Sequence, residues 1–226
     1  MTFATNDTLP SSSPNAMPSG VAVTTDNSIH CEFHPENPDF HSLSEFVCNF
    51  SPSKVTGEQF EWVSVSRGSY GGCSSAYDPG QVEAMKVAFQ ELADAHRRDG
   101  NITLTVASLD ELAKTYGVTK GKWMMFCTTA EVDATWERIV RFVCLGEAAN
   151  PGGCRYARVS PNKGDDQHVI SVYVDDFSNA EEVYSGREAL RRIGFERPIG
   201  FKMDAYTVLG IYRKNPWGIN CNRYFE

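Results

Sequence analysis

The sequence predicts an α+β domain in which a curved antiparallel β-sheet is backed on one face by about three helices. Apolar residues recur at helical spacing in three long segments, and two of these open with a Ser/Thr-x-x-Glu capping box. The strand-like segments between them are joined mostly as hairpins and do not alternate regularly with helices. The sequence shows no internal repeat.

The composition limits the function classes. With 226 residues and 41% hydrophobic content, the chain can bury one core without disulfides or metals. The formal net charge is −8 and the sequence pI is near 5.2. Affinity for DNA or a membrane surface comes largely from Lys and Arg that displace counterions. We therefore expect no DNA partner and no membrane partner.

The first 28 residues are rich in Ser, Thr, Pro and Asn and contain no Lys or Arg. Such a segment predicts a disordered tail at 1–28, followed by a single domain at 29–226. It has neither the basic start nor the apolar run of a secretory signal. The seven cysteines are odd in number and form no C-x-x-C pair, which is typical of reduced thiols. We therefore expect a cytoplasmic protein, with the nucleus as the alternative.

The expected elements follow from periodicity and turn signals. In "FEWVSVS", Phe60 and Trp62 share one face and Val63 and Val65 the other. The expected helices are 43–50, 82–98, one from Ser108-x-x-Glu111 to Gly117, one from Thr128-x-x-Glu131, and one from Ser178-x-x-Glu181 to Gly194. The expected strands are 60–66, 121–127, the hairpin 154–160 and 168–174, and the short segments 199–204, 206–213 and 221–225.

Several motifs resemble known families. The segment "GKWMMF…VDATWERIVRFVCLGEA" resembles the cap-binding translation initiation factor 4E, and the turn Lys163-Gly164-Asp165 has a counterpart there. "GKWMM", "ARVSP", "HVISVYVDDFS" and "YTVLGIYRKNPW" are more closely similar to the uncharacterised basophilic leukaemia expressed protein family. The resemblance runs from Trp62 to the C-terminus. It implies the initiation-factor-4E-like fold, and it implies no activity, because none is established for that family.

The same resemblance bears on cap binding, in which two tryptophans stack on methylated guanine. The corresponding segments 66–80 and 99–121 contain no Trp, and Tyr70 is one of the few aromatic residues there that could substitute. Trp62, Trp123 and Trp136 match core tryptophans of the fold. The resemblance therefore implies that the standard stacking pair is missing.

The positions that bind phosphate in the related fold, unlike the stacking positions, are occupied by suitable residues. By resemblance, Lys163, with Arg158 and His168, lies on the hairpin where the related fold binds phosphates. Arg213 and Lys214 lie near the last loop at the same pole. Tyr173 stands about where the related family carries a further tryptophan. The resemblance thus implies a phosphate-bearing ligand.

The segment "RKNPWG" has two interpretations. Arg213 and Lys214 could pair with phosphate oxygens while Trp217 stacks on a base. Alternatively, the two cations are solvated and Trp217 anchors the last loop to the body of the domain. Both interpretations stay open from the sequence.

Other candidate sites are weaker. The loop "RGSYGGCSSAYDPG" offers Tyr70 for stacking and Cys73 as a nucleophile with His168 as base, or it is a plain connector. Cys31, His34, His41 and Cys48 are residue types that bind zinc, but their spacing matches no common finger. Phe89 is either a partner-binding position or part of the core. We expect no metal and no cofactor.

The sequence leads to three hypotheses. The first is a non-enzymatic protein that binds a nucleotide or an RNA 5′ end at the concave face of the sheet. The second is a protein-interaction adaptor that keeps the fold without a ligand, with a protein partner on the Val82–Arg98 helix. The third is a hydrolase built around Cys73.

Overall fold

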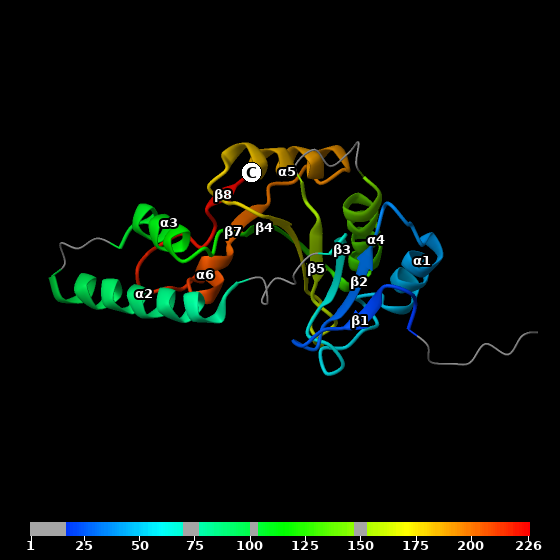
Figure 1. Cartoon of the computed structure of the whole chain (residues 1–226), viewed down its shortest axis with the longest axis horizontal. Coiled ribbons are helices and arrows are strands. Elements are labelled where there is room, and N and C mark those ends of the chain that lie inside the picture. The colour runs from blue at the N-terminus through cyan, green and yellow to red at the C-terminus, as the bar shows by residue number, and fades with distance from the viewer. Residues whose placement is uncertain (1–16, 70–76, 100–103, 147–152) are drawn as a thin grey trace, which may run out of the picture.

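The computed structural model describes residues 17–69, 77–99, 104–146 and 153–226 (Figure 1). None of the helices in these ranges is long and apolar enough to cross a membrane. The helices are α1 (Phe40–Asn49), α2 (Pro79–Asp99), α3 (Val106–Thr115), α4 (Thr129–Leu145), α5 (Ala180–Arg192) and α6 (Asp204–Val208). The strands are β1 (Val21–Val23), β2 (Ile29–Phe33), β3 (Val63–Arg67), β4 (Gly121–Cys127), β5 (Tyr156–Val159), β6 (His168–Val174), β7 (Gly200–Met203) and β8 (Tyr224–Phe225).

The strands form one sheet in the order β1-β2-β3-β5-β6-β4-β7-β8. All neighbouring pairs are antiparallel except β2 and β3, which run parallel. The central pair, β4 and β6, is in register over seven residues, with Trp123 opposite Val172. The predicted α+β class with a mostly antiparallel sheet is confirmed.

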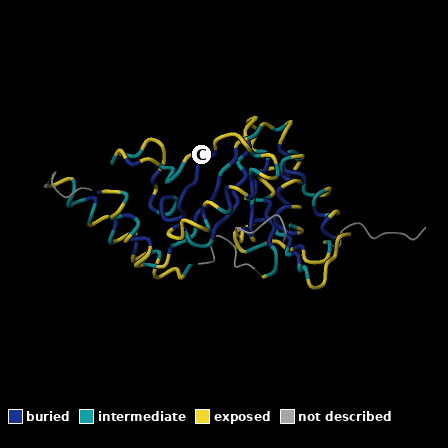
Figure 2. Tube along the Cα trace, turned by 90° about the horizontal axis from the view of Figure 1, so that it is seen from above, coloured by how far each residue is buried: buried dark blue, intermediate teal, exposed yellow. Residues whose placement is uncertain are grey.

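One face of the sheet is covered by helices α1, α4 and α5. Successive side chains of a strand point to opposite faces, so Trp123, Met125 and Val172 all lie on this helix-covered side. Trp123 is fully buried, and its Nε1 donates to the carbonyl oxygen of Val183 in α5 at 3.1 Å. Trp136 of α4 is equally buried. In Figure 2 the buried segments accordingly run through the centre of the molecule.

The other side of the sheet, here called the polar face, carries the alternate residues. One row crosses six strands in register and contains a carboxylate, a hydroxyl, two tyrosines and two lysines: Glu32, Ser66, Tyr156, Tyr173, Lys122 and Lys202. The second row contains Ser64, Arg158 and Ser171. Because polar side chains need water or partners, this face is where a ligand can be bound.

Helices α2, α3 and α6 gather beyond the β7–β8 end of the sheet (Figure 1). Helix α2 begins at Pro79, which suits the first helical position because its missing N–H needs no partner there. Its Met85 and Phe89 are buried in the common core with Tyr206 and Ile211.

The prediction of a strand at 206–213 was wrong. The chain turns directly from β7 into the single-turn helix α6, and Leu209 N–H closes that turn on the carbonyl oxygen of Ala205. Gly210, with φ of 70°, then reverses the chain, a conformation that glycine adopts without strain. Tyr206 and Ile211 are buried as a strand would bury them, but from a helix and a turn.

Smaller differences concern boundaries and caps. Strand β1 lies within the predicted tail, so regular structure begins before Ser28. Helix α3 is capped by Thr105 and Ser108, and α5 by Asn179. The capping box of Thr128 and Glu131 on α4 is confirmed, as are the bounds of β4 and β6.

The 212–219 turn is held together by one amide side chain. Asn215 donates to the carbonyl oxygens of Tyr212 at 2.8 Å and Ile219 at 2.6 Å, and it accepts from Trp217 N and Ile219 N. The ring of Trp217 meets Phe89 edge-on, with centroids 5.0 Å apart. Trp217 therefore fastens this turn to α2, as the latch interpretation expected.

We predict that Trp217→Ala lowers the free energy of unfolding by about 2 kcal/mol, because it removes half-buried aromatic surface from Phe89. Urea unfolding followed by circular dichroism measures this. Trp217→Phe, which keeps a ring on Phe89, is the matched control and should lose clearly less. Equal and negligible losses in both variants would show that the turn is not fastened here.

Candidate functional site

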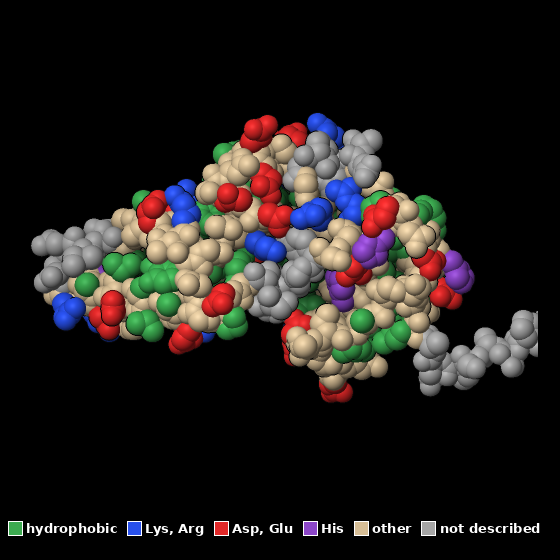
Figure 3. All heavy atoms as spheres, in the orientation of Figure 1, with side chains coloured by type: hydrophobic (Ala, Val, Ile, Leu, Met, Phe, Trp, Pro, Cys, Tyr) green, Lys and Arg blue, Asp and Glu red, His purple; other side chains and the backbone are tan. Residues whose placement is uncertain are grey.

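A pocket of about 320 Å³ opens on the polar face. Its walls come from β4, β5, α2 and α6 and from Tyr77, two residues before α2. The lining residues are Tyr77, Val82, Lys86, Lys122, Arg158, Asp204, Thr207 and Val208. On the face shown in Figure 3, Lys and Arg side chains gather over the middle of the molecule, between the α2 end and the β1–β2 end.

A buried ion pair forms one wall of the pocket. Lys122 Nζ lies 2.5 Å from Asp204 Oδ1, and the two side chains are only 6% and 4% exposed. Lys122 also donates to Thr207 Oγ1 at 3.2 Å. Tyr77 OH donates to the second carboxylate oxygen of Asp204 at 3.1 Å and accepts from Lys120 N at 3.2 Å. The pocket is therefore held rigidly where β4, α6 and the start of α2 meet.

Arg158 forms the other cationic wall. Its guanidinium carbon lies 3.9 Å above the ring of Trp62 and 5.6 Å from the ring of Tyr173. Lys163 Nζ lies 5.9 Å from the same Trp62 ring. Stacking engages the flat faces of the guanidinium, while its N–H groups lie in the plane and can grip an anion with two oxygens. The structure thus brings Arg158 and Lys163 to the ring of Trp62, and Arg158 also to Tyr173.

Trp62 corrects an expectation. It was assigned to the core with Trp123 and Trp136, but it is half-buried and stacks on Arg158 at the polar face. The signal was present in the sequence, because Trp62 shares its face with Ser64 and Ser66 and not with Val63 and Val65. A tryptophan in register with serines belongs to the polar side.

Lys202 is a second functional candidate that the sequence analysis missed. It is directly opposite Lys122 across β4 and β7, and it is 5% exposed. Its Nζ lies 3.7 Å above the ring of Tyr212. Burial, reinforced by the neighbouring Lys122 charge, lowers the pKa of Lys202 to about 8.

His168 is placed on the opposite side of the sheet from the pocket. It has the same parity in β6 as Ile170 and Val172, so it faces the helices, and it is fully buried. Its Nδ1 contacts the carbonyl oxygen of Ser160 at 2.9 Å, and its Nε2 contacts Thr129 Oγ1 at 3.3 Å. With both ring nitrogens engaged internally, His168 is not available as a phosphate ligand or as a general base.

The remaining predicted residues are not part of the pocket lining. Arg213 and Lys214 are exposed, and Trp217 packs on α2. Tyr70 and Cys73 lie outside the described residues. The grouping of Lys163 with Arg213, Lys214 and Trp217 is therefore replaced by one around Arg158, Lys122 and Trp62.

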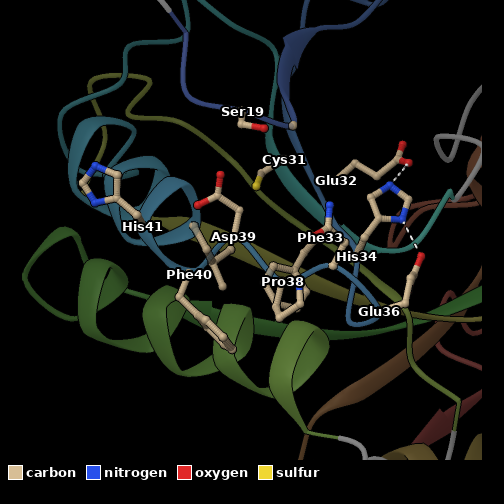
Figure 4. A pocket seen from close by; sticks show the side chains of 13 residues that line it. Ser19, Cys31, Glu32, Phe33, His34, Glu36, Pro38, Asp39, Phe40 and His41 are labelled. Atoms are coloured by element: carbon tan, nitrogen blue, oxygen red, sulfur yellow. Dashed lines mark hydrogen bonds and ion pairs between the residues drawn. The ribbon is translucent and has the colours of Figure 1, made fainter.

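A second hollow, of about 630 Å³, lies between β2 and α1 (Figure 4). His34 stands in it between two carboxylates, with Nε2 2.7 Å from Glu32 and Nδ1 3.0 Å from Glu36. These hydrogen bonds raise the pKa of His34. Carboxylates repel phosphate, so this hollow does not suit the ligand expected for the polar face.

The zinc hypothesis for Cys31, His34, His41 and Cys48 gains no support. Burial and the nearby Asp39 raise the pKa of Cys31 to about 12, which disfavours the thiolate that zinc requires. His34 is already engaged by Glu32 and Glu36. Within the part of the chain that the structure describes, no three His, Cys, Asp or Glu residues are grouped to hold a metal.

We predict a pH-dependent contribution of His34 to stability. Because its folded pKa is raised, its stabilisation is fully present below the unfolded value of about 6.5 and is lost as the pH rises through the folded value. The difference in Tm between wild type and His34→Gln should therefore be constant below about pH 6 and shrink as the pH rises through the raised folded pKa. His41→Gln, at an exposed position on α1, is the control, and a pH-independent difference for His34→Gln would contradict the assignment.

Comparison with solved structures shows similarity to three eIF4E proteins. One is a schistosome eIF4E complexed with m7GpppA and 4E-BP, at a TM-score of 0.37 and 19% identity, covering 48% of this chain and 59% of that one. The second is Caenorhabditis elegans eIF4E-3 with Mextli and a cap analog, at a TM-score of 0.35 and 15% identity, covering 40% of this chain and 53% of that one. The third is Ascaris suum eIF4E-3 with m7G cap, at a TM-score of 0.36 and 14% identity, covering 48% of this chain and 57% of that one. The match thus spans less than two thirds of each of these relatives.

A sequence model of one protein family gives the family assignment. The model described as Basophilic leukemia-expressed protein Bles03 matches residues 81–210, which is more than half of the chain. The matched range includes most of α2, all of α3 to α6 and β4 to β7, and the pocket residues Lys122, Arg158 and Asp204. The family resemblance seen in the sequence is confirmed, and this chain belongs to the family of Basophilic leukemia-expressed protein Bles03.

Proposed function

We propose that this protein binds a phosphate-bearing ligand, a nucleotide or an RNA 5′ end, in the pocket on the polar face. The observation that supports this is that Arg158 and Lys122 line one pocket next to the rings of Trp62 and Tyr173. The whole chain has a net charge of −8, whereas the pocket lining contains three basic residues, Lys86, Lys122 and Arg158, and one carboxylate, so this face differs from the average surface.

The pocket offers a ligand two kinds of contact, one from cations and one from aromatic rings. Arg158 offers paired N–H groups in a plane, which match two oxygens of a phosphate, and Lys122 adds a point charge. Trp62 and Tyr173 supply aromatic surface beside these cations. A volume of about 320 Å³ is at the small end for ligand pockets, so it suits the phosphate end of a nucleotide whose remainder lies along the face.

Binding is proposed in preference to catalysis because of Asp204. It is the one carboxylate in the described lining, and it is bonded to both Lys122 and Tyr77. A carboxylate held in this way stabilises a cation and is not placed to take a proton from a substrate. The missing stacking tryptophans argue against the cap-binding geometry, and the similarity to eIF4E proteins is too slight to transfer their ligands.

A protein-interaction adaptor is the second candidate, and one observation favours it. An apolar groove of about 360 Å³ lies between α1 and α4, on the helix-covered side. Phe40 and Leu145 in its lining are 57% and 41% exposed. On α2, by contrast, the Phe89 side chain that was considered for a partner is buried under Trp217. A partner on the Val82–Arg98 helix would have to contact other residues, such as the exposed Val87.

We predict that Arg158→Gln weakens nucleotide binding by about tenfold or more, because it removes a charge-assisted contact to phosphate. GTP, a cap analogue and a short 5′-triphosphate RNA would be titrated while tryptophan fluorescence is recorded, with Trp62 as the nearby reporter. Lys54→Gln, which changes an exposed residue away from the pocket, is the matched control and should bind as wild type does. Circular dichroism checks that Arg158→Gln is folded.

The outcome that contradicts this proposal is the absence of quenching by all three ligands at millimolar concentration in the wild-type protein. The double variant Arg213→Gln/Lys214→Gln tests whether the ligand is bound near the 212–219 turn or in the pocket that Arg158 lines. Because both residues lie outside the pocket lining, it should weaken binding less than Arg158→Gln does.

A further inference from the structure

Two lysines face each other on adjacent strands of the polar face. Lys122 of β4 and Lys202 of β7 are direct cross-strand partners, and each is 5% exposed. Side chains in such positions are close neighbours, and like charges there repel. Two ammonium groups in this arrangement lower the stability of the fold unless negative charges lie beside them.

Among the residues that the structure describes, Lys122 has an anionic partner and Lys202 has none within ion-pair distance. Asp204 lies 2.5 Å from Lys122 and 3% of its own surface is exposed. For Lys202, by contrast, none of the described residues forms an ion pair or a hydrogen bond with the amine. Its contact is with the ring of Tyr212, 3.7 Å away. Lysines that are this deeply buried are usually paired, and an anion is the kind of partner that would balance the charge.

We propose that Lys202 is a second anchor for the anionic ligand, one strand beyond Lys122, and that the ring of Tyr212 covers it when no ligand is bound. This rests on the proposed function, since it extends the same site. The ligand class that fits both anchors carries two neighbouring anionic groups, as in a diphosphate or the 5′ end of a triphosphate RNA. Arg158 and Lys122 hold one group and Lys202 holds the other.

The position of Tyr212 supports this assignment. The face of an aromatic ring carries partial negative charge, so the ring gives the amine a weak substitute for an anion. Tyr212 is 55% exposed and follows α6, whose Thr207 and Val208 line the pocket. The covering residue therefore lies four residues beyond this wall of the pocket, and it has solvent on its outer side into which it can turn.

The charges around the amine make the assignment measurable. The titratable groups that face Lys202 are Lys122, Asp204, Cys221 and Tyr212. Burial and Lys122 lower its pKa to about 8, so the amine is only partly protonated at that pH. An anion in contact with the amine favours the charged form and raises the pKa. When a ligand binds at about pH 8, the Lys202 amine should therefore take up about half a proton, which is measured as the difference from Lys202→Arg because the phosphate groups themselves can release protons.

The test is isothermal titration calorimetry of the full chain with inorganic pyrophosphate and with inorganic phosphate. Titrations at about pH 8 in two buffers of different ionisation enthalpy give the number of protons taken up. In wild type, pyrophosphate should bind about tenfold more tightly than phosphate, because it reaches the second anchor. Lys202→Met should abolish that preference and the proton uptake, while phosphate binding stays unchanged. Lys214→Met, at an exposed lysine, is the matched control and should behave as wild type does.

The outcomes separate this inference from the proposed function. Wild-type protein that binds neither anion overturns both. Wild-type protein that binds pyrophosphate and takes up no more protons than Lys202→Arg, whose guanidinium stays protonated, overturns the role of Lys202 alone, and this holds even if Lys202→Met does not fold. Equal pyrophosphate affinity in wild type and a folded Lys202→Met does the same. Lys202→Arg, which keeps the charge, should retain the preference for pyrophosphate.

Discussion

The ion pair between Lys122 and Asp204 holds the site together. Both side chains are almost completely buried, and a buried charge without its partner is strongly destabilising. The pair therefore fixes where α6 leaves β7, and Tyr77, bonded to Asp204 and Lys120, fixes where α2 begins. Three segments far apart in the sequence converge on one carboxylate. The pocket is the space that this convergence leaves open beside Arg158.

The elements that the sequence predicted well are those in which one local signal is strong. Strand β4 ends in the apolar run 123–127, which is followed at once by the capping box of α4, so its bounds match. The segment from Tyr206 has a strand-like composition but forms a single helical turn. Its conformation depends on Asp204, which pairs with Lys122, 82 residues earlier in the sequence. No local pattern contains that information.

The site residues show the same contrast between those that local patterns predict and those that they do not. Lys163, Arg158 and Tyr173 could be found because the hairpin 154–174 places them together and the family resemblance pointed to it. His168 was misplaced although it lies in the same hairpin, because one step in a strand moves a side chain to the other face of the sheet. Strand parity would have corrected both errors, since it groups His168 with the core and Trp62 with the serines.

Lys202 could not be found in this way, because its significance lies in what surrounds it. In the chain it is one lysine between Phe201 and Met203, and only the register of β7 against β4 places it opposite Lys122. A pKa near 8 means that the fold disfavours its charge, by roughly 3 kcal/mol relative to an exposed lysine. This destabilisation is complete below pH 8 and is relieved as the pH rises toward the unfolded value of about 10.4. A second carboxylate beside Lys202 would remove the destabilisation but would also repel an anionic ligand from Arg158 and Lys122. The unbalanced charge is therefore consistent with a face arranged for a ligand that brings the missing negative charge with it.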